Sequence, residues 1–558
     1  MTRPSNSSSV TLAQALTYTP RVLNFGTSGR RGDVVDLTQL EIYINARAEL
    51  DYLKDRPREE GGIRTGDNFF YAHDLRPSST RFVAEQGGRG EIAQAVEQAI
   101  RDAGLNPINL GAIPTPALTA YALARQSGSI MITGSHIPFH RNGYKTNSAM
   151  GELLKTDEAP IAEYVERWRN RVYNTPSNQS PFNDNGRFKS GSRPCSPANP
   201  TAAREYLNRY RDYFGAGALR GLRVLVYQHS AVGRDLLAEC LADLGALVAA
   251  VGRSETFIPI DTEAIDDTTL ETIRSIAADA SRDGQGYDAV VSTDGDSDRP
   301  LLVGLEYSSD GACRAQFFGG DLVGMVVAEF LGAKSVVVPI SCNDAIERGP
   351  LASVLEPQTR IGSPYVIAGM LAAIQNGARQ VCGWEANGGF LTGTSFAGPL
   401  KPLAPLPTRD AFLPILCVLR RMVAESAPMR ALFEALPPRF SKAGLLRACP
   451  RNASQRVIDA LSREAPSDSS NLAAGALAAL VAPYFTMEAG FTELARVDYI
   501  DGVRLYFANG DIAHIRPSGN ADELRIYAVA DSQARADAIV KVAATEPDGI
   551  LRRMLSDF

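Results

Sequence analysis

Short apolar runs alternate with amphipathic stretches over most of the chain. Residues 222–227 and 246–251 are strand-like runs, and residues 232–244 between them have the spacing of an amphipathic helix. This order predicts a βαβ unit, and α/β structure is expected elsewhere because similar apolar runs recur. These further runs span residues 130–132, 287–293, 300–303, 335–340, 502–507 and 523–529.

Two breaks divide the chain. Residues 174–200 are rich in Asn, Ser, Pro and Gly, which predicts a loop or linker. Pro437 and Pro438 end the α/β region before them, because proline interrupts both helices and sheets. Residues 452–481, in the last region, are rich in Ala and Ser and are expected to be helical. A chain of 558 residues is long enough for three or four domains.

The polar segment 133–145 contains a serine with the surroundings of a nucleophile. Ser135 has His136 beside it, and the Asn-Gly pair at 142–143 predicts a tight turn that brings Lys145 back toward the serine. A hydroxyl and cations in one loop suit a phosphate. A surface loop that contains a serine by chance is the alternative explanation for this segment alone.

A second candidate site is an acidic loop between two strand-like runs. Asp294, Asp296 and Asp298 occupy alternate positions, so their carboxylates can project to one side of an extended turn, and Gly295 lets the backbone bend. Such a cluster suits a hard cation, Mg²⁺ or Ca²⁺. An EF-hand is excluded because that loop requires glycine at its sixth position, where this chain has Arg299. A solvated acidic turn without a metal is the alternative.

Two further loops carry groups suited to a sugar phosphate. The turn between the runs 502–507 and 523–529 offers hydroxyl, amide and guanidinium donors for a phosphate, although a hairpin with incidental arginines is the alternative. A glycine-rich turn at 383–390 offers a carboxylate and an amide for neighbouring sugar hydroxyls. The residues concerned are Arg516, Ser518, Gly519, Asn520 and the nearby Arg525 in the first loop, and Glu385 and Asn387 in the second.

In this order along the chain, the four loops resemble the motifs of the α-D-phosphohexomutase superfamily, which includes phosphoglucomutases, phosphomannomutases and phosphoglucosamine mutases. The resemblance spans nearly the whole chain. Its motifs are the segment 25–32, the serine loop 133–145, the metal loop 294–299, the sugar loop 384–389 and the phosphate loop 516–520.

The resemblance implies an α/β fold with three similar mixed α/β domains and a smaller α+β carboxyl-terminal domain around a central active-site cleft. We place these domains at residues 1–200, 201–312, 313–436 and 437–558, so that each carries one of the four loops.

The resemblance also implies a reversible transfer of a phosphoryl group from phosphorylated Ser135 to a hexose 1- or 6-phosphate, which gives a bound hexose 1,6-bisphosphate. This intermediate then turns round and returns its other phosphate to Ser135. Asp294, Asp296 and Asp298, together with the serine, would hold Mg²⁺ against the transferring group, where charge neutralisation supplies most of the catalysis.

Roles for the other site residues follow from the same resemblance. Arg31 and Lys145 would polarise the sugar hydroxyl and assist its proton transfer. His136 would support the serine loop, and Arg299 would steady the metal loop. The substrate would be held at its hydroxyls by Glu385 and Asn387, and at its distal phosphate by Arg516, Ser518, Gly519, Asn520 and Arg525.

Several positions depart from the usual motifs. Trp384 stands where a glycine is common and Asn387 where a serine is common, and Gly389 replaces a histidine found in many phosphomannomutases. The serine loop is most similar to those of certain bacterial phosphomannomutases, which favours mannose phosphates, with glucose phosphates as the alternative. A phosphoglucosamine mutase, a metal-dependent sugar phosphatase and a non-catalytic sugar-phosphate binder are the remaining hypotheses.

Charge and cysteine content agree with a soluble enzyme. The chain has 57 basic and 63 acidic residues and a net charge of −6, so we expect no nucleic-acid partner. Seven cysteines without CxxC spacing predict free thiols in a reducing compartment, the cytoplasm. The longest small-apolar run is too short to span a bilayer, so no membrane partner is expected. Hexose phosphates are the expected partners of a monomer or homodimer.

Overall fold

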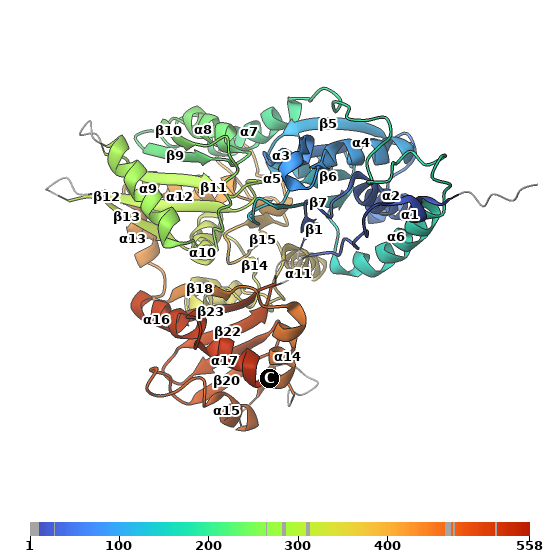
Figure 1. Ribbon diagram of the computed structural model, residues 1–558. Coiled ribbons are helices and arrows are strands. Elements are labelled where there is room, and N and C mark those ends of the chain that lie inside the picture. Colours follow the sequence, from blue (N-terminus) through green and yellow to red (C-terminus); the bar gives the residue numbers. More distant parts are fainter. Residues whose placement is uncertain are drawn as a thin grey trace, which may run out of the picture.

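The computed structural model describes residues 10–26, 28–263, 265–281, 286–308, 313–463, 470–472, 475–518 and 522–558. Their helices and strands form four sheet-centred units that follow one another along the chain (Figure 1). Three of the large sheets mix parallel and antiparallel pairs, whereas the fourth is antiparallel throughout. The predicted fold class, three mixed α/β units and one α+β unit, is confirmed.

The first unit contains α1 (Leu12–Ala15), β1 (Arg30–Asp33), α2 (Gln39–Asp55), β2 (Asn68–His73), α3 (Pro77–Thr80), β3 (Phe82–Val83), β4 (Arg89–Gly90), α4 (Ile92–Asp102), β5 (Asn106–Ala112), α5 (Thr115–Leu123), β6 (Ser129–Ile132), β7 (Arg141–Ser148), β8 (Gly151–Glu152) and α6 (Glu158–Tyr173). Its sheet has the order β1-β7-β6-β2-β5, with β8 beside β7. Residues 174–200 form the predicted connection without a helix or strand.

The serine segment connects β6 and β7, which pair antiparallel with Met131 opposite Lys145. Residues 142–143 lie inside β7, so the tight turn predicted there is wrong, and the chain reverses within residues 133–140 instead. Lys145 is therefore brought to the serine side by the register of a hairpin.

The second unit contains α7 (Thr201–Phe214), β9 (Arg223–His229), α8 (Arg234–Asp243), β10 (Leu247–Arg253), α9 (Asp267–Ala280), β11 (Ala289–Thr293), β12 (Pro300–Tyr307) and β13 (Cys313–Phe318). β9 and β10 are parallel neighbours joined through α8, which confirms the predicted βαβ unit. β13 hydrogen-bonds to β12. The domain boundary predicted between residues 312 and 313 separates these paired strands, and β13 belongs to the second sheet.

The third unit contains α10 (Gly320–Leu331), β14 (Ser335–Val337), α11 (Ser363–Gln375), β15 (Val381–Trp384), β16 (Phe390–Thr392), β17 (Leu406–Asp410), α12 (Phe412–Glu425) and α13 (Met429–Glu434). The sugar loop lies between β15 and β16, which pair antiparallel.

The fourth unit contains β18 (Phe440–Leu446), α14 (Arg451–Leu461), β19 (Ser470–Leu472), α15 (Gly475–Val481), β20 (Leu494–Asp498), β21 (Val503–Phe507), β22 (Ile512–Pro517), β23 (Leu524–Ala530), α16 (Gln533–Ala544) and α17 (Ile550–Asp557). In the segment 452–481, the predicted helical structure is found in α14 and α15, whereas Ser470–Leu472 form β19 and residues 464–469 and 473–474 lie outside the described residues. The phosphate loop joins β22 to β23.

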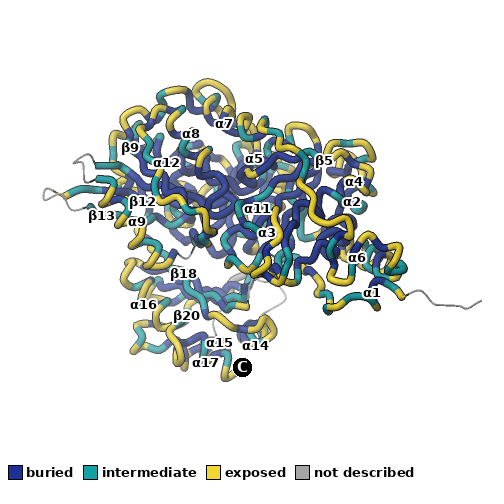
Figure 2. The backbone as a smooth tube through the Cα atoms, turned by 45° about the horizontal axis from the view of Figure 1, so that its top comes forward, coloured by how far each residue is buried: buried dark blue, intermediate teal, exposed yellow. Residues whose placement is uncertain are grey.

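One apolar core is shared by the first three units. It includes Met131 of the first sheet, Val224 of the second and Val336 of the third, whereas the fourth unit has a core of its own. In Figure 1 the fourth unit, drawn in orange and red, lies below the other three. The tube in Figure 2 is dark blue through the middle of the sheets and yellow mainly on outer turns and helices. In the described part of the chain, no helix is long and apolar enough to cross a membrane.

Trp384, which replaces a common glycine, is fully buried at the start of the sugar loop. Its indole Nε1 donates a hydrogen bond to the Asp321 carbonyl (3.0 Å), and its ring stacks on Phe390 with centroids 5.8 Å apart. Gly324 of α10 makes room for the indole, because a Cβ there would lie 2.3 Å from the Trp384 ring. The indole therefore fixes the sugar loop to α10.

We predict that Gly324→Ala lowers thermal stability, with a cost of about 1–3 kcal/mol typical of overpacked cores. Differential scanning calorimetry measures the effect. The matched control is the same substitution in a Trp384→Leu background, where the penalty should largely disappear. An equal loss in both backgrounds would contradict the packing argument.

Candidate active site

A cavity lies where the serine, metal, sugar and phosphate loops meet. Residues of all four units therefore converge on one space, as expected for a central cleft. The predicted site residues that line it are Arg31, Ser135, His136, Arg299, Glu385, Asn387, Arg516, Ser518 and Arg525. Gly519 and Asn520 lie outside the described residues, so their predicted part in the phosphate loop stays a prediction.

Ser135 is held in an uncommon backbone conformation next to the metal loop. Its φ of 53° lies in the left-handed region, which is costly for a residue other than glycine. The Ser135 Oγ donates a hydrogen bond to Asp294 Oδ2 (2.6 Å), and the Ser135 N–H donates to Thr133 Oγ1 (2.7 Å). The hydroxyl is therefore fixed against the first acid of the metal loop.

Arg76 supports the serine loop through hydrogen bonds to its backbone. This residue was not among the predicted site residues. Its guanidinium is fully buried and donates to the carbonyl oxygens of Ser135 and Arg141 at 2.9 Å, among others. Gly134 permits this approach, because a Cβ there would lie 2.5 Å from Arg76 Nε. These contacts could not be predicted from local sequence spacing, because Arg76 lies 59 residues before Ser135.

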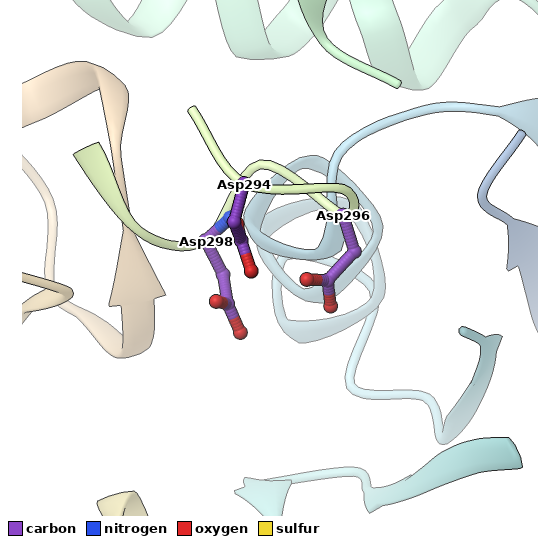
Figure 3. A group of neighbouring side chains, drawn as sticks. All are labelled: Asp294, Asp296 and Asp298. Atoms are coloured by element: carbon purple, nitrogen blue, oxygen red, sulfur yellow. The ribbon is translucent and has the colours of Figure 1, made fainter. Parts of the chain in front are cut away.

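The three predicted metal acids form a compact cluster. Oxygens of Asp294, Asp296 and Asp298 lie within 4.8 Å of one another, and the side chains point to the same side of their loop (Figure 3). Gly295 lies in the predicted bend, although its φ is not in the left-handed region. It is needed for close approach, because a Cβ there would lie 2.6 Å from the Ser135 carbonyl oxygen.

Lys145 binds this cluster directly. Its Nζ lies 2.8 Å from Asp296 Oδ2 and 2.7 Å from Asp298 Oδ2. Burial opposes ionisation of Asp296, but Lys145 outweighs it and holds the pKa of Asp296 below its ordinary value. Burial and the neighbouring carboxylates instead raise the pKa of Asp294 well above its ordinary value. Lys145 is absent from the lining of the cavity, so its predicted action on the sugar hydroxyl stays a prediction.

The cluster fits a divalent cation. Asp296 Oδ1 and Asp298 Oδ1 are buried, and neither has a hydrogen-bond partner among the described residues. Leaving such atoms unpaired is costly, and an all-oxygen donor set is the one that hard divalent cations prefer. Figure 3 shows that the carboxylates converge as such a set requires.

Arg299 and His136 line the cavity beside the serine, the first as a cation and the second as a neutral ring. Arg299 Nε lies 3.7 Å from Asp298 Oδ1 and 3.9 Å from Asp294 Oδ2, which fits the proposed support of the metal loop. His136 Nδ1 lies 3.5 Å from Ser135 Oγ. Burial and the Arg299 charge lower the pKa of His136 to about 3, so this imidazole is neutral at physiological pH.

Arg409 is a second buried arginine that sequence reasoning missed. It lines the cavity and contacts both Asp298 and Glu385. Arg409 belongs to none of the motifs described above, and its contact with Asp298 joins residues 111 positions apart, so local spacing could not predict it.

Acids of the second unit reach the phosphate loop. Arg525 lies 3.8 Å from Asp261 and 3.7 Å from Glu263, and Glu263 also lines the cavity. The Arg516 Nε lies 3.3 Å from Asp501 Oδ1 within the fourth unit. Neither Asp261 nor Glu263 was predicted as a site residue, because the segment that carries them matches no motif considered from the sequence.

Three parts of the chain match models of known domains. Residues 22–172 match the α/β/α domain I, residues 319–440 the α/β/α domain III, and residues 462–546 the C-terminal domain of phosphoglucomutase/phosphomannomutase. The chain belongs to the phosphoglucomutase/phosphomannomutase family. The predicted membership of the α-D-phosphohexomutase superfamily is confirmed.

Relatives within this family match almost end to end. A phosphomannomutase of Sinorhizobium fredii is 35% identical over 521 residues, which covers 92% of this chain and 97% of the relative. A phosphomannomutase of Salmonella muenchen is 34% identical over 521 residues, covering 93% and 94%. The fold is similar to that of a phosphoglucomutase/phosphomannomutase family protein of Burkholderia thailandensis, with a TM-score of 0.62, 18% identity, and coverage of 95% and 97%.

We predict that Lys145→Met increases the affinity of the acidic cluster for a divalent cation, because it removes the ammonium group that competes with the cation for Asp296 and Asp298. The gain should be on the order of tenfold, or about 1.4 kcal/mol. Isothermal titration calorimetry with Mn²⁺ measures it. Lys155→Met is the matched control, because Lys155 pairs with Glu158 outside the cluster. Equal affinities of the two variants would refute competition between lysine and cation.

Proposed function

We propose that the protein interconverts hexose 1-phosphates and hexose 6-phosphates, with mannose phosphates preferred, through a phosphorylated Ser135. The observation that carries this proposal is the Ser135 hydroxyl, 2.6 Å from Asp294 and facing a cavity lined by arginines. A fixed hydroxyl, a cation site and phosphate-binding guanidinium groups are the parts that phosphoryl transfer requires, because positioning and charge stabilisation supply most of its catalysis.

We assign substrate binding to the residues that the sugar and phosphate loops contribute to the cavity lining. Arg516, Ser518 and Arg525, with Gly519 and Asn520 as further proposed contacts, hold the phosphate that does not react. Forked guanidinium donors match phosphate oxygens. Glu385 and Asn387 of the sugar loop accept and donate hydrogen bonds to sugar hydroxyls.

In the transfer step, a sugar hydroxyl oxygen attacks the phosphorus of phosphorylated Ser135. A new P–O bond forms to the sugar, the bond between phosphorus and Ser135 Oγ breaks, and its electron pair returns to Oγ. The proton of the sugar hydroxyl ends on Ser135 Oγ, which becomes a hydroxyl again, and Arg31 and Lys145 assist this transfer by stabilising the developing negative charge. The same step in reverse, with the bisphosphate turned round, returns the other phosphoryl group to Ser135.

The carboxylates of Asp294, Asp296 and Asp298 would hold Mg²⁺, with an oxygen of the Ser135 phosphate as a further ligand. When bound, the cation supplies Lewis-acid neutralisation of the transferring phosphoryl group. Arg299 steadies the loop that carries these acids, and His136 supports the serine loop as a neutral imidazole. A hexose 1,6-bisphosphate serves as primer and intermediate.

We favour mannose phosphates as substrates because the more similar relatives are phosphomannomutases. Two phosphomannomutases are 35% and 34% identical to the chain, whereas a phosphoglucosamine mutase of Parafrankia is 26% identical over 442 residues. Glucose phosphates remain the alternative, because C2 epimers differ by one hydroxyl and a few contacts decide between them. The protein is proposed to act in the cytoplasm as a monomer or homodimer.

A sugar phosphatase that uses Asp294 as nucleophile is a weaker alternative. The Asp294 carboxylate accepts a hydrogen bond from Ser135 Oγ (2.6 Å) and belongs to the cation cluster, so its oxygens are already engaged and are poorly placed to attack a phosphorus. A non-catalytic sugar-phosphate binder would have no use for a cation cluster next to a fixed serine hydroxyl.

We expect purified protein with Mg²⁺ and a trace of glucose 1,6-bisphosphate to convert mannose 1-phosphate into the 6-phosphate. Glucose 1-phosphate should react more slowly. A ³¹P NMR time course follows both reactions. Ser135→Ala should abolish the conversion, while Ser353→Ala, at an exposed position of the 3-10 helix Pro350–Val354, is the control. Inorganic phosphate formed by the Ser135→Ala variant would support the phosphatase, and binding without turnover would support the silent binder.

A further inference from the structure

Arg409 lies on β17, which pairs antiparallel with β16, the strand that leaves the sugar loop. The register places Phe390 opposite Asp410, so Arg409 reaches the base of that loop. The residue is 3% exposed, and it lines the cavity beside Glu385. A buried guanidinium at this place has to be compensated by carboxylates.

The Arg409 guanidinium bridges two loops. Its Nη1 donates to Glu385 Oε2 (2.7 Å), while its Nε and Nη2 both donate to Asp298 Oδ2 (3.1 and 2.9 Å). Glu385 belongs to the sugar loop of the third unit, and Asp298 belongs to the metal loop of the second. One rigid, planar group therefore sets the separation and orientation of these two carboxylates.

Gly389 leaves the space that the Arg409 side chain occupies. A Cβ at position 389 would lie 2.6 Å from Arg409 Cδ, 2.7 Å from Cγ and 2.9 Å from Cβ. The φ of Gly389 does not lie in the left-handed region, so its backbone conformation is open to other residues. Glycine is required here for volume and not for backbone freedom.

The chemistry of arginine limits what Arg409 contributes. Burial opposes its charge, but Asp298 and Glu385 outweigh that effect and raise the pKa of Arg409 well above its ordinary value. The side chain is a permanent cation with donors and no acceptor, so it orients carboxylates without passing a proton.

We propose that Arg409 is a positioning residue that couples the sugar-binding Glu385 to the metal loop, and that Gly389 is the partner position that makes this coupling possible. The inference rests on the proposed function, since it assumes that Glu385 binds sugar hydroxyls. It adds a residue of the third unit to those that decide which sugar epimer is accepted.

The volume relation is tested without any activity. Gly389→Ala should lower the melting temperature by more than Gly393→Ala, a matched control whose added Cβ would lie no closer than 3.3 Å to any atom. In an Arg409→Ala background, the effect of Gly389→Ala should shrink, because the Cγ and Cδ atoms that it meets are gone. Additive losses in this double-mutant cycle would overturn the pairing.

The positioning role is tested with Arg409→Lys. This substitution keeps the positive charge but loses the forked guanidinium donors, and it perturbs folding less than Arg409→Ala does. kcat/KM for mannose 1-phosphate should fall on the order of a hundredfold, the scale of a small misplacement of reacting groups. The ratio of rates with mannose and glucose 1-phosphate should move toward one. Mn²⁺ affinity by calorimetry should change little, because the charge beside Asp298 is retained.

Arg421→Lys is the matched control, since Arg421 pairs with Glu329 and Glu425 outside the cavity. An Arg409→Lys enzyme with wild-type kcat/KM and an unchanged sugar ratio would overturn the positioning role. Failure of the wild-type protein to isomerise any hexose phosphate would overturn the proposed function and the sugar-ordering role with it. The melting-temperature cycle would still decide the pairing of Arg409 with Gly389.

Discussion

The arrangement of the active site depends on the neutralisation of three carboxylates that the fold places together out of contact with water. Asp294, Asp296 and Asp298 are all buried within one short loop. The cations that compensate them come from different parts of the chain, Lys145 from the first unit and Arg409 from the third. Because isolated buried charges are so costly, this requirement fixes how the units meet, and the apolar core shared by these units supplies the packing that holds them there.

Much of the site could be predicted because its chemistry is local in the sequence. Ser135 and the three metal acids each follow a strand-like apolar run, and the ends of strands are where short polar loops expose reactive groups. Arg516 and Arg525 could also be placed together, because they flank one hairpin and lie opposite each other in it. The fold brings the four loops together. The family resemblance predicted this convergence, whereas the pattern of apolar runs alone did not.

What could not be predicted depends on contacts between distant segments. Arg76 and Arg409 act through partners 59 and 111 residues away, which the local spacing of residues does not reveal. The two glycines next to them, Gly134 and Gly389, have meaning only in relation to these side chains. The glycine at position 389, where many phosphomannomutases carry a histidine, was visible in the sequence, but the aliphatic part of Arg409 that fills the space beside it was not. Similarly, the turn expected at residues 142–143 is part of a strand because these residues pair with Gly32 and Arg31 of β1, more than a hundred residues earlier in the chain.

The contacts of Arg525 bear on how quickly ligands exchange. Asp261 and Glu263 of the second unit lie beside this guanidinium of the fourth unit, where their carboxylates present the same oxygen acceptors as a phosphate. An anion that binds Arg525 has to compete with them, so part of its binding free energy is used to separate these internal partners. When the anion leaves, the acids can take back the arginine at once. We therefore expect the two acids to lower the equilibrium affinity for the anion and to shorten its residence time, which suits a site that has to release one end of a molecule before it can hold the other.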